Sequence, residues 1–305
     1  MSDHLTKLNS IFNKVKSLNE EDLYVYLLKL EKDYINGAAN NFALMVHQLS
    51  PLAFEEDKQK LFFIRQRKCT DKSIFGMMKC PFCSVALPAG SAYKLHIKKA
   101  NATCASCSED ITCEAIRLAI FVDNFNRGDY IIKSSFDLGT KLTITTKNSS
   151  WKSFSAYLLE IVKKNKRILA LPKSQQRFRA INLRWEVREI IATLRSNFSC
   201  LSIDLIKGMY RQLAFVNKIC SNYVYWSDTS LIHAAISRYL KFLELIANYP
   251  GKTMVPTIDI DLVWHTHQTQ PVRYCEYTKS LLGKILNHDD TIGSDDLGKG
   301  AARYN

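Results

Sequence analysis

The 305-residue sequence has no long apolar run and contains few glycines and prolines. No stretch approaches the roughly eighteen consecutive apolar residues of a membrane-spanning helix, and the polar start MSDHLTKLNSIFNKVKS is unlike a secretion signal. With only 11 glycines and 7 prolines, a collagen-like chain is excluded and long disordered tracts are not expected. These absences predict an ordered, soluble protein of the cytoplasm or nucleus, with no membrane span.

Helical periodicity is the main pattern that is present. Apolar residues make up 47% of the chain, enough for one large domain or two ordinary ones. Helix signals include Asn19 before EEDLYVYLLKLEKDYI, Gly37 after it, and Pro51 at the start of another helix. The segment YIIKSSFDLGTKLTITTK, around Gly139, favours a short hairpin.

The sequence therefore predicts a mainly α fold. We expect a helical bundle-like core with an inserted zinc-ribbon module and a short β-hairpin. The expected segments are an N-terminal helical segment at 1–67, a zinc-ribbon-like module at 68–112, and a helical region at 113–305 that shares one core with the first.

Nine cysteines in a chain without a secretion signal suggest metal or redox chemistry rather than disulfides. Two C-x-x-C pairs are separated by twenty residues, and each turn allows two thiolates to reach one ion at about 2.3 Å. A redox dithiol is the alternative. We predict a structural zinc ion at Cys80, Cys83, Cys104 and Cys107, because four thiolates leave no open position.

The stretch IDIDLVWHTHQTQP places two carboxylates and two histidines before a proline. If it is extended, His265 and His267 point to the same side and could chelate one ion. If it is helical, they lie about 200° apart and cannot share a metal, whereas Asp261 and His265 face each other. The capping signals favour the helix, with Asp259 as its N-cap.

Two roles remain open for these side chains. One histidine could join the NHDD segment in a His and carboxylate site with open positions, suited to iron, manganese or zinc. Alternatively, a buried imidazole bonded to a carboxylate pins the corner, and the second acidic pair caps the next segment. The candidate catalytic residues are Asp261, His265, His267, His288, Asp289 and Asp290.

Two segments of the sequence resemble each other. HQLSPLAFEEDKQKL, from His47, and HQTQPVRYCEYTKSL, from His267, share a proline four residues after the histidine and an aromatic residue three further on. Both indicate a helix end, a sharp corner and a helix opened by proline. They are either related halves of one helical core or a chance similarity.

Lysine and arginine outnumber aspartate and glutamate by 42 to 29. The excess favours contact with phosphates or acidic surfaces, although solubility alone would also explain it. The run KKNKRILALPKSQQRFRAINLRW interleaves cations with Phe178 and Trp185. Nucleic acid could bind there through Lys163, Lys164, Lys166, Arg167, Arg177, Arg179 and Arg184.

The C-terminal motif resembles the glycine-rich-domain-protein-like family of plants and fungi, which lacks a firmly assigned activity. The matching residues are Asp259, Asp261, Leu262, Trp264, His265, His267, Gln268, Pro271, Tyr274, His288, Asp289 and Asp290. A looser resemblance extends to CPFC…CASC and to the helices from SIDLIKGMYRQLAFVNKI onward. This chain lacks a glycine-rich tail, and relatives continue past DDLGKGAARYN, so this end is expected to be frayed or truncated.

The sequence favours a zinc-containing intracellular protein that acts by binding a protein partner. The alternatives are a metal-dependent enzyme, an oxygenase or hydrolase with a His/Asp site, and nucleic-acid binding through the basic face. Whether the protein is an enzyme is left open at this stage.

Overall fold

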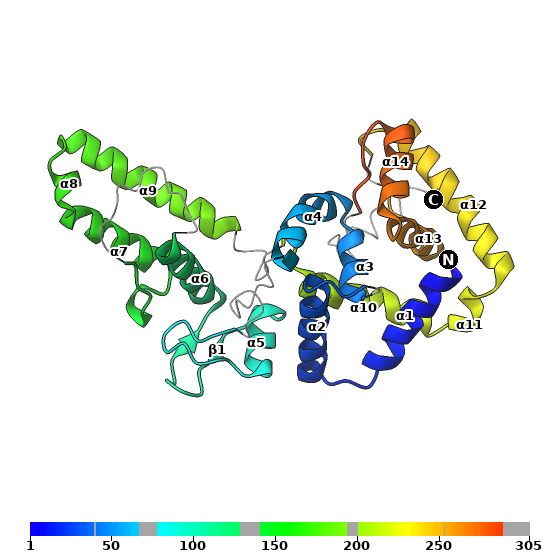
Figure 1. Ribbon diagram of the computed structural model, residues 1–305, viewed down its shortest axis with the longest axis horizontal. Coiled ribbons are helices and arrows are strands. Elements are labelled where there is room, and N and C mark those ends of the chain that lie inside the picture. Colours follow the sequence, from blue (N-terminus) through cyan, green and yellow to red (C-terminus); the bar gives the residue numbers. More distant parts are fainter. Residues whose placement is uncertain (40, 67–77, 129–140, 194–200, 253, 289–305) are drawn as a thin grey trace. The chain divides into compact units, whose positions relative to one another are not determined.

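The computed structural model describes residues 1–39, 41–66, 78–128, 141–193, 201–252 and 254–288 (Figure 1). These residues form fourteen α-helices, one 3₁₀ helix and one two-stranded antiparallel sheet, so the predicted mainly α fold is confirmed. No helix in these ranges is long and apolar enough to cross a membrane. The chain divides into a first unit, Met1–Thr70 with Leu201–Asn305, and a second unit, Asp71–Cys200.

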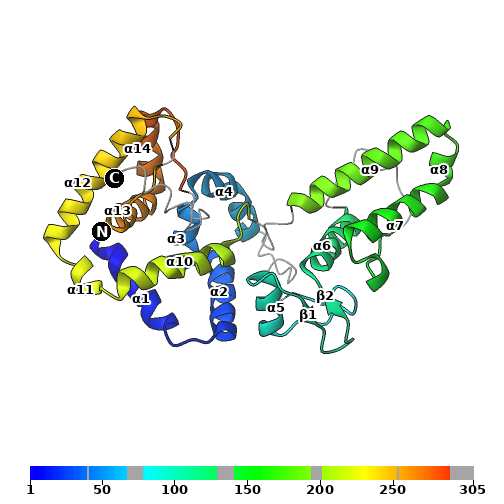
Figure 2. The ribbon, with the colours of Figure 1, turned by 180° about the vertical axis from the view of Figure 1, so that it is seen from behind.

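The first unit is entirely helical in its described residues. The Asn19 side chain caps the helix at Glu20–Ile35 by accepting a hydrogen bond from the Asp22 backbone N–H. Gly37 follows the same helix with a positive φ of 101°. Its helices are α1 (Ser2–Val15), α2 (Glu20–Ile35), α3 (Phe42–Gln48), α4 (Pro51–Gln66), α10 (Leu205–Cys220), α11 (Tyr223–Trp226), α12 (Thr229–Asn248), α13 (Ile258–Gln268) and α14 (Pro271–Leu282) (Figures 1 and 2).

Helix α10 lies against α1, α2 and α3 in this unit. A small residue is needed at Gly208, because a Cβ atom there would approach Val46 Cγ1 to 2.8 Å. Helices α3 and α10 therefore pack more closely at this point than a larger residue at position 208 would allow.

The two similar sequence segments form the same local structure. Helices α3 and α4 meet at a corner opened by Pro51, and α13 and α14 meet at one opened by Pro271. In each case the histidine before the corner contacts a tyrosine hydroxyl through Nδ1 at 2.9 Å, His47 with Tyr34 and His267 with Tyr239. The shared contacts favour two related halves over chance similarity.

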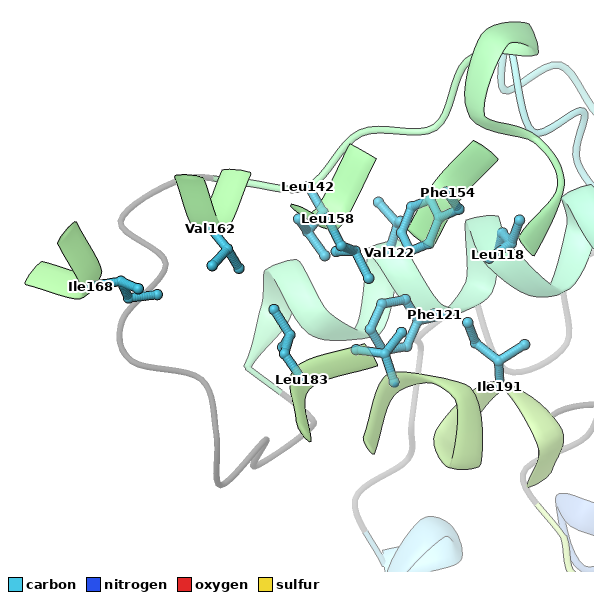
Figure 3. Packing of buried hydrophobic residues seen from close by; sticks show 11 residues of the cluster. Leu118, Phe121, Val122, Leu142, Phe154, Leu158, Val162, Ile168, Leu183 and Ile191 are labelled. Atoms are coloured by element: carbon cyan, nitrogen blue, oxygen red, sulfur yellow. The ribbon is translucent and has the colours of Figure 1, made fainter. Parts of the chain in front are cut away.

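The second unit joins the cysteine module to a helical layer. Leu118, Phe121 and Val122 of one helix pack against Phe154 and Leu158 of the next, in the core shown in Figure 3. Its elements are α5 (Ala89–His96), β1 (Ala102–Thr103), β2 (Asp110–Ile111), α6 (Cys113–Arg127), the 3₁₀ helix η1 (Thr146–Asn148), α7 (Trp151–Lys164), α8 (Lys166–Leu169) and α9 (Lys173–Thr193).

The division into units differs from the expected segments. Helix α6 packs one face, including Ile116, on the cysteine module and the other, including Phe121, on α7 and α9. Residues 113–200 therefore group with the module and not with the C-terminal helices, as the expected 113–305 segment assumed.

The β-hairpin also lies in a different place from the one expected. It pairs β1 with β2 inside the cysteine module, with Ala102 opposite Ile111. Much of the segment around Gly139 lies outside the described residues, and 141–145 form no strand. Asn126 holds part of this segment instead, since its side chain exchanges two hydrogen bonds with the Leu142 backbone.

Candidate metal centres

The two C-x-x-C turns have the same backbone geometry. In the first, the Ser84 N–H donates to the Cys80 carbonyl at 2.9 Å, and in the second the Ser108 N–H donates to the Cys104 carbonyl at 2.9 Å. Both serines have positive φ values, 61° and 59°, which non-glycine residues rarely adopt. Because the same strained turn follows both cysteine pairs, we infer that its shape is needed to hold the two sulfur atoms of each pair in position.

The four sulfurs have the spacing of a tetrahedral metal site. Cys80 Sγ lies 3.7 Å from Cys107 Sγ, and Cys83 Sγ lies 3.7 Å from Cys104 Sγ. Four thiolates bonded to one ion at about 2.3 Å would be about 3.8 Å apart. The pairs join one turn to the other, so the module could hold a metal ion. Cys113 is separate, because its thiol donates to the Leu95 carbonyl.

The protonation states of these thiols differ without an ion. Backbone N–H groups of Cys107 and Ser106 lower the pKa of the Cys104 thiol to about 6. Burial raises the pKa of the Cys80 thiol to about 12. Since a coordinating thiol is deprotonated outright, a bound ion would remove this difference.

The WHTHQ motif is helical, as the capping signals favoured, but its N-cap differs. Helix α13 begins at Ile258 with Thr257 as the N-cap, so the prediction of Asp259 in that role is wrong. Asp259 lies in the first turn, where a carboxylate complements the helix dipole, and accepts a hydrogen bond from Arg238 at 2.8 Å.

His267 has a structural role at the corner. The Tyr239 hydroxyl lies 2.9 Å from its Nδ1, and the Tyr274 ring meets it edge to face with centroids 5.1 Å apart. Burial lowers the pKa of His267 and raises the pKa of Tyr239, so the contact joins a neutral imidazole and a protonated hydroxyl. The partner of His267 is therefore a tyrosine hydroxyl and not the carboxylate that the sequence suggested for a pinned imidazole.

His265 faces another direction and meets His288 and Asp261. His288 Nε2 lies 2.9 Å from Asp261 Oδ1 and 3.3 Å from His265 Nε2. The His265 Nε2 to Asp261 Oδ1 distance is 3.4 Å. Ligands bonded at about 2.0–2.1 Å to one ion, at tetrahedral or octahedral angles, would be about 2.8–3.4 Å apart. The three atoms could therefore hold one metal ion.

Hydrogen bonds to Asp261 and a shared metal ion would each bring these atoms together. Three ligand atoms lie within 3.4 Å of one another, and each Nε2 can either donate a proton to the carboxylate or bind a metal. Burial alone would raise the pKa of Asp261, but the charges of His265, His288 and Lys218 and the hydrogen bond from His288 hold it below its usual value. Asp261 is thus ionised and ready to act as a ligand.

A chain of buried hydrogen bonds positions His288. The Trp264 indole N–H donates to the Tyr274 hydroxyl at 2.8 Å, and that hydroxyl donates to the Leu286 carbonyl at 2.7 Å. The Trp264 ring then meets the His288 ring edge to face at 4.8 Å, while Phe215 lies against His265 at 4.4 Å. The sequence alone did not reveal this role of Trp264 and Tyr274. Only the fold brings the Leu286 carbonyl to the Tyr274 hydroxyl.

The cluster opens into a cleft of about 690 Å³ in the first unit. Asp261, His265 and His288 line it with Trp264 and residues of α10. The size is within the usual range for small-molecule sites. The predicted candidates Asp289 and Asp290 lie outside the described residues, and His267 is not among the residues that line this cleft.

The predicted basic surface lies on three helices of the second unit. Lys163 and Lys164 end α7, Lys166 and Arg167 belong to α8, and the three remaining arginines lie on α9: Arg177, Arg179 and Arg184. The apolar side chains of Phe178, Ile181 and Trp185 are also exposed on α9, by 65%, 55% and 64%. This helix therefore presents cations and rings together.

Fold and site define a predominantly helical protein with a four-cysteine module and a His/Asp cluster in a cleft. The model of the glycine-rich domain-containing protein-like family matches residues 162–277. Over that segment the resemblance predicted from the sequence is confirmed, because residues 162–277 are similar to the glycine-rich-domain-protein-like family. The match includes Asp261 and His265, but His288 and the four cysteines lie outside it.

Two curated relatives from Arabidopsis thaliana are similar to part of the chain. Glycine-rich domain-containing protein 1 is 39% identical over 105 residues, which cover 33% of this chain and 12% of the relative. Glycine-rich domain-containing protein 2 is 36% identical over 104 residues, covering 33% of this chain and 13% of the relative. The similarity thus spans a small part of these relatives' length. No solved structure matches the chain.

Proposed function

We propose that this protein is a metal-dependent enzyme for a small-molecule substrate, with its centre at Asp261, His265 and His288. The observation that carries the proposal is the convergence of these three ligand atoms, within 3.4 Å of one another, at the wall of a cleft. The proposal takes up the enzyme alternative of the sequence analysis in preference to partner binding alone.

Two imidazoles and one carboxylate would leave coordination positions open, as in metal-dependent oxygenases and hydrolases. An ion held there would supply Lewis-acid or redox chemistry to a substrate in the cleft. The chain's own residues hold the ligands in place. Trp264 and Phe215 fix the two imidazole planes through ring contacts, and the Tyr274 hydroxyl anchors the segment before His288.

We also propose that the four cysteines bind a structural zinc ion. The sulfur spacing and the matching turns support a closed tetrahedral site, which leaves no position for a substrate. The two centres would then divide their roles, with zinc stabilising the second unit and the His/Asp centre carrying the chemistry in the first.

Metal content tests the catalytic centre. Full-length protein reconstituted with zinc, iron(II) or manganese(II) should hold two equivalents of metal per chain by elemental analysis. His265→Ala and His288→Ala should each hold one, because two protein ligands bind an ion far more weakly than three. His233→Ala is the matched control, since His233 is exposed on α12 away from the cleft.

Circular dichroism must show each variant folded for this comparison to hold. A wild-type chain that never exceeds one equivalent, with any of the three metals, would contradict the proposed centre. A second equivalent that survives in both His265→Ala and His288→Ala would contradict the ligand assignment.

The second unit supports a second candidate function, nucleic-acid binding. Its sequence contains 21 lysines and arginines against 10 aspartates and glutamates, whereas the first unit has 21 against 19. Almost all the excess charge is thus in the unit whose α9 helix exposes Phe178 and Trp185. Cations contact phosphates and exposed rings stack on unpaired bases, so a single strand fits this surface.

Salt dependence tests this second candidate. A labelled single-stranded RNA should bind the full chain, and the triple variant Lys166→Gln, Arg167→Gln, Arg177→Gln should reduce the slope of log affinity against log salt by about two. Fluorescence anisotropy at several salt concentrations gives the slope. The control variant carries glutamine at three lysines of the first unit, Lys14, Lys16 and Lys29. Absence of binding at low salt, or an equal effect of the control, would argue against this surface.

A further inference from the structure

The cleft beside the His/Asp cluster has a cationic wall. Arg211, Phe215 and Lys218 follow one another along α10 at i, i+4 and i+7, so they share one helix face and line the cleft together. Lys252, just after α12, lines it as well. Arg211, Lys218 and Lys252 thus line the same cleft as Asp261.

The cations are not a consequence of a generally basic unit. The first unit as a whole is close to neutral, with 21 basic against 19 acidic residues in its sequence. Among the described residues that line the cleft, Asp261 is the single acid, and it belongs to the cluster. The positive charge at this cleft is therefore local, and it raises the local concentration of anions.

Another part of the cleft wall is apolar. Met254 and Ile258 also line it, and their side chains are only partly buried. An apolar surface of this kind gains free energy when a hydrocarbon group covers it. The cleft thus combines cationic side chains, apolar side chains and the His/Asp cluster within one volume of about 690 Å³.

We propose that the ligand of this cleft is a small organic anion, a carboxylate or phosphate ester with an aliphatic or aromatic body. This inference rests on the proposed function and names its substrate class. The anionic group binds at Lys218 and Lys252, the apolar body lies on Met254, Ile258 and Phe215, and the bonds next to the anionic group face the His/Asp cluster. A lysine ammonium accommodates either anion as a compact point charge.

Three probes of one chain length test the inference on the full-length protein without added metal. Octanoate and octyl phosphate carry the anion, and octanamide is the neutral analogue. Isothermal titration calorimetry should show that at least one of the anions binds about tenfold or more tightly than octanamide, since a hydrogen bond to a charged group has this effect. Lys218→Gln and Lys252→Gln should each weaken anion binding about tenfold and leave octanamide binding unchanged.

The control variant is Lys241→Gln, on the α12 helix and absent from the cleft lining. Equal affinity for the anions and octanamide, or no effect of either lysine variant, would overturn the inference. Metal content is measured in parallel on the same protein after reconstitution with zinc, iron(II) or manganese(II). Two equivalents without a preference for anions would overturn the substrate class and leave the metal centre standing. One equivalent would overturn the metal centre, whatever the anion result.

Discussion

Replacing Cys104 with serine is expected to unfold the cysteine module of the second unit and to release the zinc ion proposed for it. Cys80 and Cys104 are almost fully buried, and the apolar residues around them, Leu87, Leu95 and Ile111, form only a small core. A module of this size cannot offset its conformational entropy by burial alone. Structural zinc supplies on the order of 10–16 kcal/mol in small zinc domains, so loss of one thiolate removes most of the stability.

The unfolding should stop at helix α6. Leu118 and Phe121 pack on α7 and α9 in a core that contains none of the four clustered cysteines, so this layer should remain folded. Hydrogen exchange should therefore show lost protection in residues 78–112 and retained protection in α7 and α9. Treating the wild type with a strong zinc chelator should give the same pattern.

Cys113→Ser is the matched control for this experiment. It changes a cysteine of the same unit that donates to the Leu95 carbonyl and lies outside the set of four, and a serine hydroxyl can replace that donor. The control should retain metal and protection. If Cys104→Ser also retained both, the four-cysteine site would have no structural role.

The clustering of the four cysteines could be predicted from the sequence because the information needed is local. Each C-x-x-C turn fixes two sulfurs within four residues, and spacing alone shows that two such turns can share an ion. The helices starting after Asn19 and at Pro51 were also predicted, because caps and proline act on the first turn of a helix.

The His/Asp cluster was only partly predictable. Helix geometry indicates that His265 and His267 point in different directions and that Asp261 faces His265. It does not indicate which histidine meets His288, which is 23 residues from His265. Which histidine meets His288 depends on the corner at Pro271 and on the hydrogen bonds from Trp264 through Tyr274 to Leu286. The helical spacing of residue types along the sequence does not reveal these contacts.

The division into units was less predictable still. Helix α6 has apolar residues on two faces, and periodicity does not reveal which segment each face will contact. Residues 1–70 and 201–305 form one unit through tertiary contacts such as the hydrogen bond from the Gln268 side chain to the Leu49 carbonyl. Asp57 makes a second such link, and its removal should have a large effect.

Asp57→Ala is expected to destabilise the first unit by about 3–5 kcal/mol, the usual result of leaving a buried charge network without one partner. Asp57 is fully buried on α4 and accepts hydrogen bonds from the Ser202 N–H at 2.7 Å and from the Ser202 hydroxyl at 2.8 Å. Lys60 Nζ lies 2.9 Å away and His47 Nε2 lies 3.3 Å away. The carboxylate thus ties α4 to the segment before α10, 145 residues later in the chain.

The Asp57 carboxylate should also give the stability of this unit a characteristic acid dependence. Burial alone would raise the pKa of Asp57, but the nearby His47 imidazole and the hydrogen bonds from Lys60 and Ser202 outweigh it and hold the pKa well below its usual value. A depressed pKa in the folded state stabilises the protein above the unfolded value of about 4, and the contribution is lost as the pH falls toward the folded value. Between about pH 4 and pH 2, the unfolding free energy of the wild type should therefore fall more steeply than that of Asp57→Ala.

Urea denaturation at several pH values, followed by hydrogen exchange of amides in α4 and α10, measures both effects. Glu56→Ala is the matched control, because Glu56 is next in the chain and pairs with the same Lys60, but its side chain is 65% exposed. An exposed pair contributes about 0–1 kcal/mol, so this variant should unfold almost like the wild type. Equal destabilisation by the two variants, or parallel acid profiles for wild type and Asp57→Ala, would show that burial of Asp57 does not set the strength of this link. A large effect confined to Asp57→Ala would instead locate the stability of the first unit in the contact that joins its two distant parts of the chain.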